Sequence, residues 1–149
     1  MTTNYPVSSV LIHKTSALWS VAPEATVFEA IKLMAEKNIG CLLVMSGVKL
    51  AGVFTERDYT RKIALHGKNS RETRVGEIMS GEIVTVTADD SVEECMRLMT
   101  NNRVRHLPVM EGANVIGLVS IGDLVNWTIS TQNAQIEQME KYISGSVPL

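Results

Sequence analysis

Gly52-Val53-Phe54-Thr55-Glu56-Arg57-Asp58 is followed 65 residues later by a stretch of the same pattern, Gly117-Leu118-Val119-Ser120-Ile121-Gly122-Asp123. Each stretch has a glycine, two apolar residues, a threonine or serine, and an aspartate three positions after that hydroxyl residue. Apolar residues before the hydroxyl indicate the end of a buried strand, and the hydroxyl with its acid is typical of a helix start. Two equivalent strand-to-helix turns therefore decide the fold.

The similarity between the two halves extends well beyond these turns. Residues 21–59 align with residues 86–124 without a gap, and identical pairs include Val27/Val92, Leu42/Leu107 and Gly47/Gly112. We interpret this as one duplicated ancestral unit. Because units of about 60 residues are marginally stable alone, we expect the two copies to share a core as a pseudo-symmetric pair.

Within each copy, the pattern predicts the order β-α-β-β-α and therefore an α+β fold of α/β-like units. In the first copy Thr26 and Glu29 form a predicted capping box at a helix start. The expected elements are a packed lead-in at 10–12 and strands at 18–21, 41–45 and 50–54. One helix is expected to follow Thr26 and end near 39–40, and a second helix is expected to span 56–66. Gly67 is expected to end the second helix as a left-handed cap.

The predicted organisation is a first repeat at 10–66, a linker at 67–74, a second repeat at 75–128 and a helical tail at 129–149. Residues 1–9 are expected to be loose. Apolar residues recur along the tail on one helical face, and Ser130-Thr131-Gln132-Asn133 is expected to interrupt that helix. Pro108, which aligns with Leu43, suits an edge or the start of a strand better than a central one.

Composition places the chain among ordinary globular proteins, with 149 residues, 45% hydrophobic, 20% charged and a net charge of −2. This charge gives no general field for nucleic acid or anionic lipid. Cys41 and Cys95 form neither a disulfide framework nor a zinc-binding spacing. No apolar run approaches the roughly 18 residues of a membrane span, and the start of the chain lacks a signal-peptide pattern. We therefore expect a cytoplasmic protein.

Sequence motifs for catalysis are missing. Gly47 and Gly52 have the spacing of a phosphate loop, but Val53 and Phe54 stand where Lys and Ser or Thr are required, and no dinucleotide-binding glycine motif is present. Cys41 and His106 occupy equivalent positions, so a metal site or a Cys-His nucleophile is a minor alternative. We predict no enzyme, no metal and no catalytic cofactor.

The repeated turns allow two interpretations. In the first, Asp58 and Asp123 only cap their helices, near the positive end of the helix dipole. In the second, they also bind a ligand, because a carboxylate can accept both ribose hydroxyls and helix amides can meet a phosphate. Aspartate in place of the longer glutamate, and a glycine in each preceding strand, favour the second interpretation.

The doubled β-α-β-β-α order, the repeated turn and the segment Val104-Arg105-His106-Leu107-Pro108-Val109 resemble a tandem pair of CBS domains, a Bateman module, over roughly residues 10–128. The resemblance implies two pseudo-symmetric units packed as one module, with two clefts that bind AMP, ADP, ATP, S-adenosylmethionine or NAD. It also implies a homodimer and a role as a sensor that controls another protein.

Carried over to this sequence, the resemblance implies that Asp58 and Asp123 hold ribose hydroxyls and that Thr55 and Ser120 contact ribose or phosphate. The remaining implied nucleotide-binding residues are Ile39, Gly40, Cys41, Val104, Arg105, His106, Lys14, Thr15, Met79 and Ser80. The first repeat departs from the pattern, since Gly40-Cys41 replaces Arg105-His106. Arg57 and Arg61 are candidates to compensate for it, although a solvated helix face is an equal alternative.

The favoured function is therefore a stand-alone regulator that binds an adenine nucleotide and senses the energy or redox state in signal transduction. One alternative is a purely structural dimerisation module without a ligand, and another is an enzyme of unknown chemistry. The apolar tail and the methionine-rich helix faces predict a homodimer. A downstream protein target is expected, with no nucleic acid and no membrane as partner.

Overall fold

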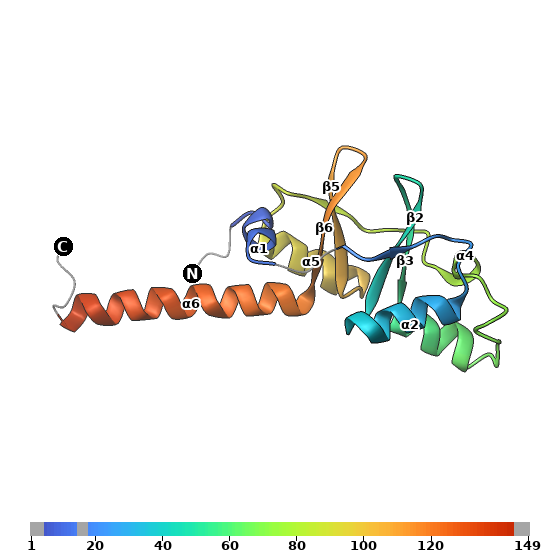
Figure 1. Cartoon of the computed structure of the whole chain (residues 1–149). Coiled ribbons are helices and arrows are strands. Elements are labelled where there is room, and N and C mark those ends of the chain that lie inside the picture. The colour runs from blue at the N-terminus through green and yellow to red at the C-terminus, as the bar shows by residue number, and fades with distance from the viewer. Residues whose placement is uncertain (1–4, 15–17, 145–149) are drawn as a thin grey trace. The chain divides into compact units, whose positions relative to one another are not determined.

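The computed structural model describes residues 5–14 and 18–144, and within them the chain forms two three-stranded sheets flanked by helices (Figure 1). The α+β class and the two copies of β-α-β-β-α are confirmed. The elements are α1 Ser8–Ile12, β1 Ser20–Val21, α2 Val27–Lys37, β2 Cys41–Ser46, β3 Lys49–Thr55, α3 Glu56–Asp58, η1 Tyr59–Ala64, α4 Val75–Ile78, β4 Val86–Thr87, α5 Val92–Asn102, β5 His106–Glu111, β6 Asn114–Ser120 and α6 Ile121–Ser144.

The sheet of the first repeat has the order β1-β2-β3. β1 runs parallel to β2, and β2 and β3 form an antiparallel hairpin whose turn uses Gly47 at φ 62°. A side chain is strained at positive φ, so this turn favours glycine. The hairpin register pairs Cys41 with Thr55, which brings the start of β2 beside the strand-to-helix turn.

The long helices of the two repeats begin as predicted. The Thr26 hydroxyl accepts a bond from the Glu29 amide at 3.1 Å, and Ser91 does the same for Glu94 at 3.0 Å. Their ends differ from the prediction, because α2 stops at Asn38 in the left-handed conformation before it reaches Ile39 and Gly40. Asparagine tolerates this conformation better than most residues.

The segments that precede the two repeats are exchanged between them. Pro6, just before α1, forms a bridge with Ser91 of the second repeat, whereas Arg74 and Ser80, on either side of α4, bridge Thr26 and Val53 of the first. Contacts accordingly divide the chain into one compact unit of residues 1–15, 86–107 and 119–149 and another of residues 16–85 and 108–118.

This exchange corrects the expectation that residues 1–9 are loose, as far as the structure describes them. Val7 is fully buried, and its amide donates to the Asp90 carbonyl at 2.7 Å. The predicted apolar lead-in is the short helix α1. Composition alone did not reveal this order, because it depends on backbone pairing with the distant turn before α5.

The segment after Thr55 is not the single α-helix predicted for 56–66. One turn, α3, passes directly into the π-helix η1, in which the Leu65 amide donates to the Thr60 carbonyl at 3.1 Å. Gly67 has φ 64°, as a left-handed helix end requires. π-Helical turns are rare and frequently lie at functional sites.

Two further expectations were wrong. α6 continues without a break through residues 130–133 to Ser144, and the polar side chains there do not interrupt it. Pro108 lies inside β5, which is the central strand in the order β4-β5-β6. β4 has only two residues, so few ladder positions are needed on that side of β5.

The core around the first repeat consists of apolar residues from one face of its hairpin, from α2 and η1, and from the exchanged helix α4. Its members are Val27, Ala30, Met34, Leu42, Val44, Phe54, Ile63, Val75 and Ile78. At Gly52 this packing leaves no room for a side chain, since an added Cβ would lie 2.7 Å from the Ser80 carbonyl oxygen and 2.8 Å from Met79 Sδ. Gly52 therefore makes room for Met79 and Ser80, which follow α4 in the chain.

This close approach predicts that Gly52→Ala destabilises the protein by about 1–3 kcal/mol, the usual cost of overpacking a core. Gly81→Ala is the matched control, because an added Cβ there meets nothing within 4 Å and surface changes usually stay within about 0.5 kcal/mol. Urea unfolding of both variants measures the difference. Equal stability of the two variants would contradict the packing at Gly52.

Candidate functional site

The first candidate site is built on the turn between β3 and α3. The Thr55 amide donates to Asp58 Oδ2 at 3.0 Å, and the Asp58 amide donates to Thr55 Oγ1 at 3.2 Å. This reciprocal pair is the predicted capping box, and it fixes the carboxylate at the positive end of the helix. Asp58 is only 8% exposed, so its charge must be compensated within the protein.

The compensation at Asp58 comes from its second oxygen. Lys62 Nζ lies 3.1 Å from Oδ1, and Ser80 Oγ is 3.5 Å from the same atom. Lys62 also donates to the Ile78 carbonyl at 2.8 Å. One carboxylate oxygen thus accepts the helix-cap bonds. The other faces the Lys62 ammonium group of η1 and the Ser80 hydroxyl of the exchanged segment.

The second candidate site repeats this plan at the turn between β6 and α6. The Ser120 amide donates to Asp123 Oδ2 at 2.9 Å, and the Asp123 amide donates to Ser120 Oγ at 3.1 Å. Lys14 Nζ contacts the same Oδ2 at 2.7 Å. Here the cation itself comes from the exchanged segment, which follows α1 in the chain.

Each aspartate therefore has a lysine, but from a different place. The residue equivalent to Lys62 is Trp127, and the residue equivalent to Lys14 is Met79, so neither lysine recurs in the other copy. Both sites thus have an aspartate–lysine pair. At the first site the lysine lies on the helix that follows the turn, and at the second site it lies in the exchanged segment after α1. The sequence prediction included Lys14 but missed Lys62, which its i,i+4 spacing from Asp58 could have revealed.

The pKa values of Asp123 and His106 at the second site differ from the ordinary values of these groups. Burial by itself raises the pKa of Asp123, but the hydrogen bonds from Lys14 and Ser120 and the charge of Lys14 outweigh it, so the pKa lies below its usual value. Burial also lowers the pKa of His106, and the positive charge of Lys14 adds to this effect. At neutral pH the site thus holds an ionised carboxylate and an uncharged imidazole.

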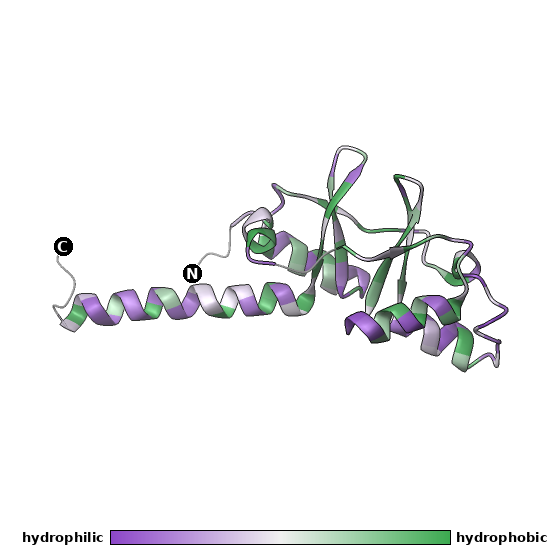
Figure 2. Cartoon of the chain, viewed as in Figure 1, coloured by the Kyte–Doolittle hydropathy of each residue, from purple (hydrophilic) through white to green (hydrophobic). Residues whose placement is uncertain are grey.

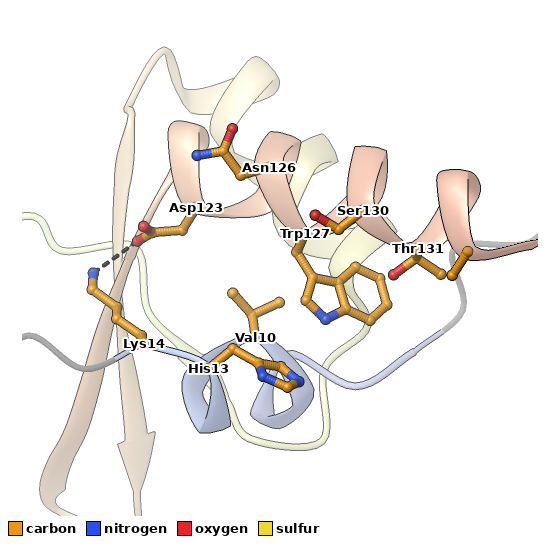
Figure 3. Close-up of a pocket in the computed structure, with 9 residues that line it drawn as sticks. Val10, His13, Lys14, Asp123, Asn126, Trp127, Ser130 and Thr131 are labelled. Carbon is orange, nitrogen blue, oxygen red and sulfur yellow. Dashed lines mark hydrogen bonds and ion pairs between the residues drawn. The ribbon is translucent and has the colours of Figure 1, made fainter. Parts of the chain in front are cut away.

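A pocket of about 580 Å³ extends from Asp123 along α6 (Figure 3). Lys14 points to Asp123 on one side, and the Trp127 ring lies over Val10 and His13 on the other. Tyr5 meets Trp127 edge-on, with ring centroids 5.0 Å apart. The pocket combines an aromatic wall with convergent polar groups, which is usual for small-molecule sites. Its remaining lining residues are Asn126, Ser130, Thr131 and Ala134.

The predicted segments before β2 and β5 lie beside the turns in both repeats. The Glu56 amide donates to the Gly40 carbonyl at 3.1 Å, and the Ile121 amide donates to the Arg105 carbonyl at 2.8 Å. Ile39 and Val104 each donate to the preceding helix, to Met34 and Met99, at 3.0 Å. The backbone thus holds these segments next to the first residue of the following helix.

The side chains of these segments differ in charge. Arg105 is exposed and His106 half-buried, whereas Gly40 is followed by the buried Cys41. The space that a Cβ at Gly40 would need is taken by Glu56 Oε1, at 2.6 Å. The first site thus has a carboxylate near the place where the second has an arginine. Arg57 and Arg61 are exposed on α3 and η1.

The sequence prediction missed several residues that line the pocket. One residue that it did include, Thr15, lies outside the described residues. Thr15, equivalent to Ser80, cannot be placed for that reason. Trp127, Asn126 and His13 were missed because no motif marks them, although Trp127 has the same i+4 spacing from its aspartate as Lys62.

Cysteine chemistry and metal binding find little support in the described residues. Cys95 is buried, and burial, with the charges of Asp90 and Glu94, raises its pKa to about 11, so its reactive thiolate form is disfavoured. Over residues 5–14 and 18–144, no group of three or more His, Cys, Asp or Glu could hold a metal ion. None of the helices there is long and apolar enough to cross a membrane.

The protein family follows from the comparison with known proteins. The CBS-domain model matches the chain twice, at residues 7–65 and 75–130. The chain therefore belongs to the CBS-domain family, and the predicted tandem pair is confirmed. The match begins three residues before the predicted start of the first repeat, at the buried Val7.

Two relatives and two solved structures show how far the similarity extends. The chain is 42% identical over 135 residues to the mitochondrial CBS domain-containing protein CBSX3 of Arabidopsis thaliana, with 87% of this chain and 65% of the relative covered. It is 33% identical over 128 residues to YhcV of Bacillus subtilis, with 86% and 91% covered. The chain thus spans about two thirds of CBSX3 and most of YhcV.

Among solved structures, a CBS-domain protein of Burkholderia ambifaria, whose description proposes a signal-transduction role, is 47% identical with a TM-score of 0.83, covering 86% of this chain and 96% of that one. A hexameric CBS-CP12 protein from bloom-forming cyanobacteria is 30% identical with a TM-score of 0.74, covering 83% and 68%. The names of these relatives describe CBS-domain proteins and no catalysed reaction. At least one such protein is oligomeric.

The Lys14–Asp123 pair predicts a pH-dependent contribution to stability. Because the pKa of Asp123 is lowered in the folded state, its contribution is present above the unfolded pKa of about 4 and is lost as the pH falls below it. In Asp123→Asn the cap bonds can be kept, because the asparagine amide oxygen can accept from the Ser120 amide and the backbone amide still donates to Ser120 Oγ, but the ion pair is lost. The free energy of unfolding should therefore be lower than wild type at pH 7 and converge with it in acid.

Urea unfolding between pH 7 and pH 3 measures this convergence. Asp89→Asn is the control, because Asp89 is exposed and loses the same charge at a site without such a partner. A stability difference between wild type and Asp123→Asn that does not change with pH would show that the ion pair contributes nothing.

Proposed function

We propose that the protein is a regulator that binds an adenine nucleotide, AMP, ADP, ATP or NAD, at the two aspartate turns. The observation that carries this proposal is the buried or half-buried aspartate at each turn, held by its own helix cap and paired with one lysine. A cap alone needs no cation. A fixed carboxylate beside an ammonium group matches a ligand that joins hydroxyl donors to a phosphate.

The turns act on the ribose in this proposal. The reciprocal cap bonds hold each carboxylate before the ligand arrives, so little conformational freedom is lost on binding. The two ribose hydroxyls donate to the carboxylate, as in other nucleotide-binding folds. The lysine pairs with the carboxylate in the empty site and then turns toward the phosphate, which replaces the aspartate as its partner.

The two sites differ in their preference for phosphate. Around Asp123, Lys14, Arg105 and His106 supply cationic or proton-binding groups, and Arg105 can pair with a phosphate through two hydrogen bonds. The equivalent region near Asp58 has Gly40, Cys41 and the Glu56 carboxylate, and Arg57 and Arg61 are exposed on the helices that follow the turn. We therefore assign the more highly phosphorylated ligand to the Asp123 site.

The regulatory role is part of the same proposal. Ligand binding would change the response of a downstream protein in signal transduction, as the description of the Burkholderia relative suggests for that protein. The proposal includes a cytoplasmic location and no catalytic activity. A structural module without a ligand is the second candidate, and the caps alone support it, because they explain both aspartates as helix starts.

Ligand-dependent stability tests the proposal. An adenine nucleotide at one hundred times its dissociation constant should stabilise the fold by about 2.7 kcal/mol. Asp58→Asn and Asp123→Asn each remove one charge-assisted bond of roughly 1.5–3 kcal/mol. Affinity at the altered site should therefore fall on the order of ten- to a hundredfold, as measured by isothermal titration calorimetry with AMP, ATP and NAD.

The module without a ligand predicts a different result. The two variants would then lose about 1 kcal/mol or less of stability without ligand, and nucleotides would change neither them nor wild type. Asp89→Asn again serves as the control for a lost surface charge. If AMP, ATP and NAD all fail to bind wild type at millimolar concentration, the nucleotide proposal is wrong.

His106 predicts that binding of a phosphorylated ligand takes up a proton. Its pKa is lowered in the free protein by burial and by Lys14, and a phosphate dianion beside it would raise that pKa. Affinity for AMP should then increase as the pH falls from about 8 to about 6.5, the range above the phosphate's own pKa of roughly 6. Calorimetry in buffers of different ionisation enthalpy measures how many protons are taken up when AMP binds.

Two comparisons isolate the role of His106. Adenosine, which lacks the phosphate, should bind wild type with little dependence on pH. His106→Gln should remove most of the pH dependence for AMP. If His106→Gln and wild type show the same pH dependence, the imidazole does not face the phosphate.

A further inference from the structure

The tail helix α6 has a stripe of apolar residues that residues 5–14 and 18–144 of its own chain leave uncovered. The stripe consists of Val125, Ile129, Ile136, Met139 and Ile143, which follow one another at steps of four, seven, three and four residues. Ile136 is 52% exposed, Met139 62% and Ile143 79%. With Gln132, these residues fill consecutive a and d positions of a heptad repeat, in which isoleucine takes three a positions.

The stripe faces away from the rest of its compact unit. At about 100° per residue, its six positions fall within roughly 80° of the helix circumference. Trp127, Ser130, Thr131 and Ala134, which line the pocket beside α1, fall on the opposite side. Neither the pocket nor α1 can therefore cover the stripe.

The second half of α6 extends past α1 and α5 of its own unit (Figure 1), and apolar and polar residues alternate along it (Figure 2). Leu124 is the buried residue of this helix, so its tertiary contacts concentrate at its start. Most helical stability in proteins comes from packing of an amphipathic face. A projecting helix with an uncovered apolar face therefore needs a partner.

The width of the stripe identifies the kind of partner. A helix that packs on a globular surface usually shows a broader apolar face, whereas a narrow a and d stripe is typical of a coiled coil. A lipid surface fits poorly, because interfacial helices carry many Lys and Arg on their polar face. Here the last two turns have Lys141 as their only basic residue, with Glu137 and Glu140 nearby.

We propose that α6 forms a parallel, in-register coiled coil with α6 of a second copy of this chain. The polar residue Gln132 decides the direction. In a parallel pair it meets the partner's own Gln132 across the seam, and the two amides can hydrogen-bond to each other. In an antiparallel pair centred on the same stripe it would face Ile136, which leaves an amide in an apolar layer without a partner.

The flanking positions agree with this arrangement. In a parallel pair each g position lies beside the e position five residues further along the second helix. Those neighbours are Thr128 with Asn133 and Gln135 with Glu140. No like charges oppose each other, so nothing at the edges of the seam works against association.

The proposal is independent of nucleotide binding, because the stripe and the pocket lie on opposite faces of α6. The seam runs from Val125 to Ile143, which is about three heptads and near the lower limit for a coiled coil. The full chain should therefore associate reversibly, with a dimer fraction that rises with protein concentration.

Sedimentation equilibrium of the full chain between about 1 and 100 µM tests the seam, since dissociation constants in this range correspond to roughly −5 to −8 kcal/mol. Ile136→Glu places a charge in the central a layer and should weaken dimerisation at least tenfold. Gln138→Glu adds the same charge at an exposed position outside the seam and should leave dimerisation unchanged. Circular dichroism checks that both variants keep their helices.

Met139→Cys tests the direction. Parallel pairing places this d position opposite its own copy, so mild oxidation should give a covalent dimer. The native Cys41 and Cys95 are buried, and oxidised wild type is the control for them. A wild-type chain that stays monomeric, or an Ile136→Glu variant that dimerises like wild type, would overturn the seam. A dimer in which Met139→Cys does not cross-link would overturn the parallel direction.

Discussion

The reciprocal bond between a hydroxyl residue and the aspartate three positions later is the interaction on which both candidate sites depend. It satisfies amides at the start of the following helix and fixes the carboxylate at the end of the preceding strand. A carboxylate at that place costs free energy unless a cation approaches it. The position of Lys62 and of Lys14 follows from that requirement.

The exchange of the two lead-in segments brings one of those cations, Lys14, and the Ser80 hydroxyl into place, whereas Lys62 lies on η1. Lys14 comes from the segment after α1 and Ser80 from the segment after α4, and each reaches the aspartate of the repeat on which its segment packs. Duplication thus gives two equivalent turns, while the exchanged segments and the helices that follow make them chemically different. Arg105 against Gly40 and Trp127 against Lys62 are the clearest differences.

Much of this arrangement could be predicted from the sequence, because repetition doubled each local signal. The capping boxes at Thr26 and Thr55, the hairpin turn at Gly47 and the family were predicted correctly from residue types and spacing. The exchange of α1 and α4, the π-helix and the order at Val7 were not, because they depend on backbone contacts between distant segments. The unbroken α6 was missed because local propensity underestimated a long amphipathic helix.

The direct test of the central claim is native mass spectrometry of the full chain as purified, which detects any small molecule that remains bound. The account predicts an additional mass of an adenine nucleotide on wild type, reduced in each of Asp58→Asn and Asp123→Asn and lost when both are changed. A wild-type protein that carries no nucleotide, and gains none when AMP, ATP or NAD is added at millimolar concentration, would contradict it.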